Sequence, residues 1–462
     1  MYATPATLPA ARSGAAHGGA LATTESADAT RSADATRSAD ATRSANATHS
    51  AETTGCAETA ESANAAAYAH AAAYEDAAAY ADAAARPVDL ASRARILSLI
   101  EPHELWASAY VPTEGDLLLG TYCVQRQIGR GSFGTVVRAR HVVTNTAVAV
   151  KVLHKLDWLH LGVRHEERVY KLLLRGCSPN ISLFAKVLGS GVDQGFSCTV
   201  FELCDLTICD IIKGGAGLVP LPPAHLCEIA NQIMRGVAYL HSLGLIHTDI
   251  KPDNIALRRA DTVALRQMDG AGVFHPKRIL ASTAICIIDL GGVVTFKQAS
   301  RMKGLNCAPM YRPPELILGL PWSYGVDTYA VGCVIAELYL LGNLFHAEVA
   351  SDREHLAIIE RVLDRFPLGF AVAVEQQVPG TFHTALAASV IFPPAGAAYN
   401  AAKYTFAMQR VLEAEHITAR VHDVELVDLL LNLLMVDPAG RIPLHVALRH
   451  VYFDKLRRPR AM

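Results

Sequence analysis

The chain contains 462 residues, which is enough for two or three domains and a sizeable core. Its 42 lysines and arginines nearly balance its 44 aspartates and glutamates, and this small net charge argues against nucleic acid as the main partner. The ten cysteines form no C-x-x-C pair and no zinc-like spacing with histidine, so we expect free thiols in a reducing compartment.

The sequence shows no targeting or membrane segment. The amino terminus lacks a basic segment followed by an apolar run, and the most apolar window, residues 329–345, is interrupted by Glu337. We therefore expect a core helix in that window rather than a membrane span. These features predict a soluble intracellular protein that makes no membrane contact. We also expect a monomer, and the choice between nucleus and cytoplasm stays open.

Residues 1–89 differ sharply in composition from the rest of the chain. Alanine, threonine, serine and aspartate dominate, and two six-residue repeats occur, SADATR-like units from Ser26 and AAAY units ending at Tyr68, Tyr74 and Tyr80. So few large apolar side chains cannot offset the entropy of ordering, which predicts a disordered N-terminal arm. Residues 90–118 regain aliphatic side chains, and we expect an extension packed against the following domain.

The pattern from residue 119 predicts an α+β fold with two lobes. Three strand-like segments, YCVQRQIG, TVVRARHVV and TAVAVKVL, precede a helical segment at about 164–174, and this small β-rich lobe spans residues 119–203. A larger helical lobe follows over residues 204–455, and a basic tail spans 456–462. Its clearest helical segments are 224–243, 326–341, 354–366 and 424–434.

A glycine-rich segment, GRGSFGTV at residues 129–136, separates the first two predicted strands. In a dinucleotide-binding fold such a motif opens a helix, but here β-branched residues flank it on both sides. The glycines would let a hairpin backbone approach nucleotide phosphates, and a structural turn is the alternative. The candidate nucleotide contacts are Ile128, Gly129, Gly131, Gly134 and Val136.

Lys151 ends the apolar strand that also contains Ala149, a further candidate nucleotide contact. A lysine at this place is usually a snorkelling surface residue, but after a glycine loop it is expected to pair with the α- and β-phosphates. The next helix should supply its orienting carboxylate. We favour Glu166, because core-facing residues follow it at helical spacing, and Glu167 is the second candidate.

The segment LIHTDIKPDNI, residues 245–255, concentrates the residues that phosphoryl transfer needs. Asp249 could accept a hydroxyl proton, Lys251 could offset charge on the moving phosphoryl group, and Asn254 could help to hold Mg²⁺. Farther on, Asp289 in the segment IIDLG is a second candidate metal ligand, with a turn-forming role as the alternative.

With seven such motifs in order over residues 120–455, the chain resembles the eukaryotic protein kinases. The resemblance implies ATP and Mg²⁺ as cofactors, Asp249 and Lys251 as catalytic residues, and a protein substrate. It makes Phe201 the gatekeeper, assigns adenine binding to the backbone of Glu202 and Cys204, and places Ala256 beneath adenine, where leucine is usual. It also implies structural roles for Asp327 and for a pair between Glu315 and Arg441.

Within the CMGC group, the sequence is most similar to the LAMMER kinases, relatives of the SR-protein and DYRK kinases. The stretches that carry this resemblance are VFELCDLTICDIIK, IHTDIKPDN and the LAMMER-like tract EHLAIIER at residues 354–361. It implies transfer of the γ-phosphoryl group of ATP to serine or threonine, sometimes tyrosine, often in Arg/Ser-rich proteins. Arg-Ser dipeptides also occur in the arm, where self-phosphorylation and repeat expansion without function are both open.

Two positions depart from the general kinase pattern. Thr248 stands where most kinases carry an arginine that pairs with a phosphorylated activation loop, so we expect activity that is independent of loop phosphorylation. Ala308 stands where a threonine normally contacts the catalytic residues, which could weaken substrate alignment. A pseudokinase scaffold is therefore the main alternative to an active enzyme, and a small-molecule kinase is disfavoured by the segment at 311–315.

Overall fold

The structure, a computed structural model, describes residues 110–131, 134–153, 160–214, 217–268, 274–302, 304–305, 307–346, 348–349, 351–385, 388–394 and 401–457. The chain divides into two units, residues 1–65 and 66–462, and the described residues all belong to the second. The predicted N-terminal arm, its Arg-Ser dipeptides and most of the predicted extension lie outside the described residues, as do residues 458–462.

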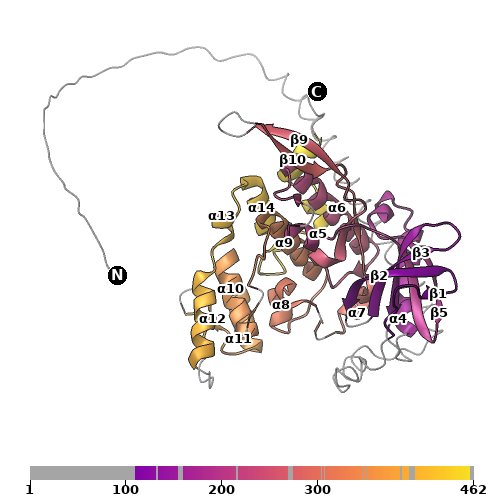
Figure 1. Cartoon of the computed structure of the whole chain (residues 1–462). Coiled ribbons are helices and arrows are strands. Elements are labelled where there is room, and N and C mark those ends of the chain that lie inside the picture. Colours follow the sequence, from indigo (N-terminus) through magenta and orange to yellow (C-terminus); the bar gives the residue numbers. More distant parts are fainter. Residues whose placement is uncertain are drawn as a thin grey trace, which may run out of the picture. The chain divides into compact units, whose positions relative to one another are not determined.

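The first lobe is built on a six-stranded antiparallel sheet with the order β1-β2-β3-β4-β6-β5 (Figure 1). Its strands are β1 (Leu117–Leu118), β2 (Tyr122–Gly131), β3 (Gly134–His141), β4 (Ala147–Leu153), β5 (Val187–Asp193) and β6 (Phe196–Glu202). One long helix, α4 (His160–Arg175), contacts β5 and β6. The β-rich first lobe with one main helix agrees with the fold expected from the sequence.

Alternation along the strands separates the core of this lobe from its functional face. Val148, Val150 and Val152 of β4 are buried, whereas Ala149 and Lys151 are only partly buried, because successive strand residues point to opposite faces. The buried set packs against side chains of the neighbouring strands, including Val137, Ala139 and Val200. This arrangement fixes Lys151 on the face opposite the valine core.

The second lobe is helical and contains the larger core. Its helices are α5 (Ile208–Ile212), α6 (Pro223–Ser242), α7 (Phe296–Ala299), α8 (Pro314–Ile317), α9 (Gly325–Leu340), α10 (Asp352–Leu363), α11 (Leu368–Gln377), α12 (Ala401–Glu413), α13 (Ile417–Arg420), α14 (Val424–Leu433), α15 (Leu444–Ala447) and α16 (Asp454–Arg457). Residues 326–338 of α9 are all buried, so the apolar window read from the sequence is a core helix. No helix among the described residues is long and apolar enough to cross a membrane.

Two pairs of short strands in the second lobe hold the ends of the loops that carry the candidate site residues. Strand β7 (Leu245–Ile246) pairs with β12 (Val294–Thr295), and β8 (Ile255–Leu257) pairs with β11 (Ile285–Ile287). The loop 247–254 therefore connects one pair to the other. Residue 289 lies two positions after the end of β11, so the two segments that carry Asp249 and Asp289 emerge side by side.

A hairpin fills the long spacer between these segments. Strand β9 (Thr262–Met268) pairs with β10 (Phe274–Leu280), and the hairpin extends from the helical lobe above α5 and α6 in Figure 1. A last small pair joins β13 (Phe382–His383) to β14 (Ser389–Val390).

Candidate active site

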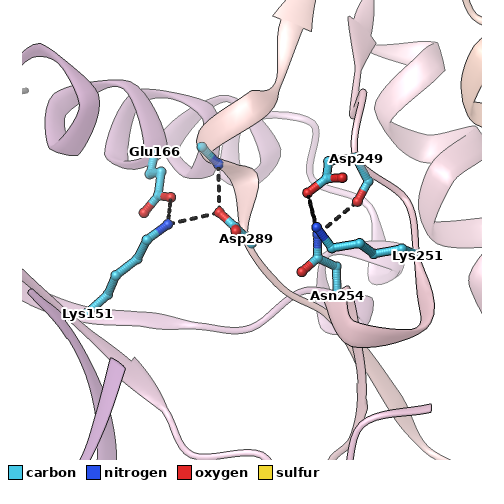
Figure 2. A network of polar contacts seen from close by, with 7 residues as sticks. Lys151, Glu166, Asp249, Lys251, Asn254 and Asp289 are labelled. Atoms are coloured by element: carbon cyan, nitrogen blue, oxygen red, sulfur yellow. Dashed lines mark hydrogen bonds and ion pairs between the residues drawn. The ribbon is translucent and has the colours of Figure 1, made fainter. Parts of the chain in front are cut away.

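Lys151 lies at the centre of an ion-pair chain between the lobes (Figure 2). Its Nζ is 2.5 Å from Glu166 Oε1 and 2.8 Å from Asp289 Oδ1. Burial alone would lower the pKa of Lys151, but the two carboxylates outweigh it and raise that pKa. Burial tends to raise the pKa of Asp289, and the adjacent Lys151 overcomes this effect and holds it well below its usual range. Both side chains are therefore charged near neutral pH.

The helix α4 brings Glu166 to this chain. Glu166, Val169 and Leu173 are buried on one stripe of the helix, since residues three and four apart share a face. Glu167 lies off this stripe and pairs with Lys171 at 2.7 Å. The contact to Lys151 is thus made by the first of the two sequence candidates.

Two further contacts hold α4 against the segment that follows Asp289. The Nε2 atom of His165 lies 2.6 Å from the carbonyl oxygen of Val293, to which it must donate. A Cβ atom on Gly291 would lie 2.7 Å from Glu166 Oε1, so a larger residue there would displace the carboxylate that contacts Lys151. His165 was not predicted from the sequence, although it directly precedes Glu166 in the predicted helix.

The three polar residues of the loop 247–254 form a second cluster (Figure 2). Lys251 Nζ is 2.7 Å from Asp249 Oδ2. The amide nitrogen of Asn254 donates to the backbone oxygen of Asp249 at 2.8 Å and to Oδ2 at 3.0 Å. These contacts fix the carboxylate of Asp249 beside an ammonium group, an arrangement suited to receiving a substrate hydroxyl.

The side chains of Asn254 and Asp289 fit a Mg²⁺ site. Because Asn254 donates through its nitrogen to Asp249, its amide oxygen is turned away, towards the side on which Asp289 lies (Figure 2). The described residues contain no group of three or more histidine, cysteine or acidic side chains that could enclose a metal. A pair of oxygen ligands without a full cage is typical of Mg²⁺ held jointly with substrate phosphates.

Asp327 of α9 anchors the loop from beneath. Its carboxylate accepts hydrogen bonds from the backbone N–H groups of His247 at 2.7 Å and Thr248 at 2.8 Å, and it contacts the ring of His241 at 3.0 Å. Burial would raise the pKa of Asp327, but these contacts lower it, so the carboxylate remains ionised. The buried anion therefore holds the loop backbone in place.

Thr248 adopts a backbone φ of +75°, which is unusual for a β-branched residue. Its N–H is held by Asp327, and its hydroxyl donates to the carbonyl oxygen of Gly292 at 2.8 Å. The residue thus links the loop 247–254 to the segment after Asp289. A neutral hydroxyl makes this link at the place where most kinases have an arginine.

The described part of the glycine-rich segment lies at the end of β2 and the start of β3. Gly129 pairs with Val136, and Gly131 pairs with Gly134, in antiparallel register; residues 132–133 lie outside the described residues. A Cβ on Gly134 would collide with the backbone oxygen of Val152, whereas one on Gly131 would meet open space. Gly134 is therefore required by strand packing.

The connection between the lobes begins where β6 pairs with β4. Ala149 is opposite Phe201, and the side chain of Glu202 turns to Arg258, with 2.7 Å between Glu202 Oε1 and Arg258 Nη1. Arg258 also donates to the carbonyl oxygens of Ser182 and Phe184, so it ties this connection to the second lobe. The sequence analysis did not find Arg258.

The cysteines correct one expectation. Seven described cysteines are free, but Cys204 is joined to Cys286, which lies 82 residues later. The expectation of free thiols was based on sequence spacing, and spacing contains no information on which distant residues a fold brings together. Cys286 lies opposite Ala256 in the β8–β11 pair, so these three residues lie together below the connection between the lobes.

A small pocket adjoins Asp249 on the side of the activation segment. Its walls include Thr248, Leu305, Cys307 and Tyr311. Ala308 is half-buried and does not line it, whereas its neighbour Cys307 does. Below this segment Glu315 and Arg441 form the expected pair, with contacts of 2.6 and 3.0 Å between buried side chains.

Comparison with known protein families shows to which family the chain belongs. The model of the protein kinase domain matches residues 122–453. The chain belongs to the protein kinase family. The crystal structure of the PF14_0431 kinase domain has a TM-score of 0.64 and 23% identity, over 75% of this chain and 99% of that one, and supports the fold.

The curated relatives of this kinase include dual-specificity kinases of the CLK, or LAMMER, type, which confirms the resemblance read from the sequence. The chain is 31% identical over 347 residues to the probable dual specificity protein kinase madd-3 of Caenorhabditis elegans and spans 37% of that protein. It is 31% identical over 346 residues to the human dual specificity protein kinase CLK1, covering 68% of it. In both alignments 74% of this chain is matched.

Proposed function

We propose that this kinase transfers the γ-phosphoryl group of ATP to serine or threonine hydroxyls in protein substrates. The observation that carries the proposal is the simultaneous presence of two assembled clusters, Lys151 with Glu166 and Asp289, and Asp249 with Lys251 and Asn254. A kinase that only acts as a scaffold has no need to keep both in contact.

Each residue has a distinct role in the proposed mechanism. Asp249 accepts or orients the substrate hydroxyl, and Lys251 offsets negative charge on the transferred group. Lys151, held by Glu166, places the α- and β-phosphates. Asn254 and Asp289 would hold Mg²⁺, which when bound would neutralise charge on the phosphates. Rate enhancement then comes mainly from positioning and electrostatic complementarity.

The nucleotide lies, in this proposal, between the glycine-rich turn and the connection between the lobes. The residues around it are Ile128, Gly129, Gly131, Gly134, Val136, Ala149, Ala256 and the backbone of Glu202 and Cys204. Ala256 is buried directly below this connection, because β8 forms a bridge from Ala256 to Thr207. Its small side chain leaves more room beneath adenine than a leucine would.

The resemblance to LAMMER kinases favours Arg/Ser-rich proteins, and we propose them as the first substrate class to test. The test is transfer of radiolabelled phosphate from ATP to an Arg/Ser-repeat peptide, to the same peptide with alanine for serine, and to a tyrosine peptide. We expect labelling of the serine peptide above both others. Equal labelling of the tyrosine peptide would extend the proposal to dual specificity, and binding of ATP with no labelling of any acceptor would favour the pseudokinase alternative.

A further inference from the structure

Cys204 and Cys286 are joined at the junction of the two lobes, yet their backbones are far apart for such a link. Their Cα atoms are separated by 7.5 Å, whereas disulfides usually span roughly 4.4–6.8 Å between Cα atoms. To reach the usual disulfide geometry, the two backbones must approach each other. The sulfur atoms are thus in contact in a fold whose backbone is not drawn together.

The packing around the two cysteines explains why their sulfur atoms can meet. Residues after Cys204 lie along β8, with hydrogen bonds from Asp205 N to Leu257 O at 2.9 Å and from Leu257 N to Leu206 O at 2.7 Å. Cys286 in β11 is opposite Ala256 in β8. Because Ala256 ends at its methyl group, the space between the connection and β11 is left to the two sulfur atoms.

Cys204 and Cys286 also differ in their access to solvent. Cys286 is fully buried, whereas Cys204 is half-buried at the edge of the connection between the lobes. A small diffusing oxidant therefore reaches Cys204 first, and Cys286 is the thiol placed to react with the product. An accessible thiol next to a second one is the usual arrangement of a redox pair.

We propose that Cys204 and Cys286 form a reversible, peroxide-sensitive thiol pair that controls nucleotide binding. Hydrogen peroxide converts the thiolate of Cys204, with one proton, to a sulfenic acid and releases one water. The thiol of Cys286 then attacks that sulfur, the S–S bond forms, and the second water leaves. The two thiols lose two electrons and two protons in total, and the peroxide is reduced to water.

The consequence for nucleotide binding depends on the proposed function, in which the backbone of Cys204 receives adenine. A disulfide with the usual Cα–Cα separation needs a shorter span than the 7.5 Å seen between these residues, so a stable bond draws that backbone towards β11. The donors and acceptors offered to adenine then move out of place, and ATP binding weakens. Reduction by a dithiol reverses the change.

The experiment uses the full chain, first fully reduced and then treated with hydrogen peroxide. Peptide mapping by mass spectrometry should find a Cys204–Cys286 link, and binding of the fluorescent analogue mant-ATP with Mg²⁺ should weaken at least tenfold. Dithiothreitol should restore binding. The variant Cys286→Ala should bind mant-ATP equally well before and after peroxide, and Cys209→Ser, which changes a half-buried thiol of α5, should behave like the wild type.

Two results would overturn the proposal: an oxidised protein without the Cys204–Cys286 link, or a protein that contains the link and still binds mant-ATP as the reduced form does. If Cys286→Ala does not fold, Cys204→Ser serves for the mapping, since it also removes the link. A reduced protein that binds mant-ATP but transfers no phosphate would contradict the proposed function alone and leave the thiol pair standing.

Discussion

Glu166 shows how one helical register decides which carboxylate serves Lys151. The side chain of Glu166 is buried with the stripe of Val169 and Leu173, whereas Glu167 pairs with Lys171 at the surface. The sequence permitted this choice because helical spacing places apolar residues and the functional carboxylate on one face. The exact partner atoms, including the contact to Asp289, depended on the closure of the two lobes and could not be read from spacing.

The neighbouring glutamates offer a matched pair of variants. Glu166→Gln removes a charge-assisted hydrogen bond worth about 1.5–3 kcal/mol, and we expect kcat/KM for ATP to fall by about tenfold to one hundredfold. Glu167→Gln removes only a surface pair, worth less than about 1 kcal/mol, and should leave kcat/KM nearly unchanged. Steady-state kinetics on both variants checks this, and equal losses would contradict the assignment.

Thr248 is the second residue whose role the structure sharpens. Its substitution by valine keeps β-branching at a φ of +75° but removes the hydroxyl that donates to Gly292. We expect Thr248→Val to lower the free energy of unfolding by about 0.5–1.5 kcal/mol and to reduce phosphoryl transfer, because the segment after Asp289 loses its anchor. Thr248→Ser should retain the hydrogen bond. Denaturant unfolding measures both variants. Equal free energies of unfolding for the valine and serine variants would contradict a role for the Thr248–Gly292 hydrogen bond.

At the scale of elements, the LAMMER-like tract is an internal helix. Its residues lie on α10, where Glu354, His355, Leu356, Ala357, Ile358 and Ile359 are all buried. Glu354 has its carboxylate 2.6 Å from Arg410 of α12. The tract therefore stabilises the packing of the second lobe. Within the described structure its residues contact the core rather than the candidate site.

His355 on this helix makes stability depend on pH. Burial, assisted by Arg312, lowers the pKa of His355 to about 4. The unfolded chain takes up the proton near pH 6.5 and the folded chain does not, so stability is lost as pH falls from about 6.5 to about 4. The loss attributable to this residue is about 3 kcal/mol over that window. The variant His355→Gln should lack it.

Urea unfolding at several pH values between 4 and 7 measures this difference. On acidification the free energy of unfolding of the wild type should fall more than that of His355→Gln. The ring of His355 packs against that of Phe345, with 69° between the ring planes. Parallel curves for the two proteins would show that His355 does not titrate as described.

Sequence patterns predicted elements better than connections between elements. Strands β2, β3 and β4 and the helices α6, α9 and α14 were evident from the sequence, because each is an apolar run or has an apolar stripe, whereas β1 and β5 were not predicted. The hairpin of β9 and β10 was not evident, since Val263, Leu265 and Phe274 are exposed on it and their pattern is not that of a core strand. The pairing of Cys204 with Cys286 also depended on strand register.

At the scale of the whole molecule, the two lobes are already connected through the chain from Glu166 to Asp289. Contacts from Thr248 and His165 to residues 292 and 293 hold the start of the activation segment without any charged loop residue. We therefore expect protein treated with a phosphatase to retain phosphoryl-transfer activity within about twofold of the untreated protein. Loss of activity that is recovered on incubation with ATP would contradict this.

Phosphoryl transfer by this kinase should depend above all on Asp249, and the variant Asp249→Asn measures that dependence. Asp249→Asn keeps the size of the side chain but removes the carboxylate. We therefore expect mant-ATP binding close to wild type and at least a hundredfold lower turnover of an Arg/Ser peptide. This loss of turnover corresponds to about 3 kcal/mol or more of transition-state stabilisation. Asp261→Asn, at an exposed carboxylate beside Arg259, serves as the control and should be fully active. Equal turnover by Asp249→Asn and wild type would contradict the account.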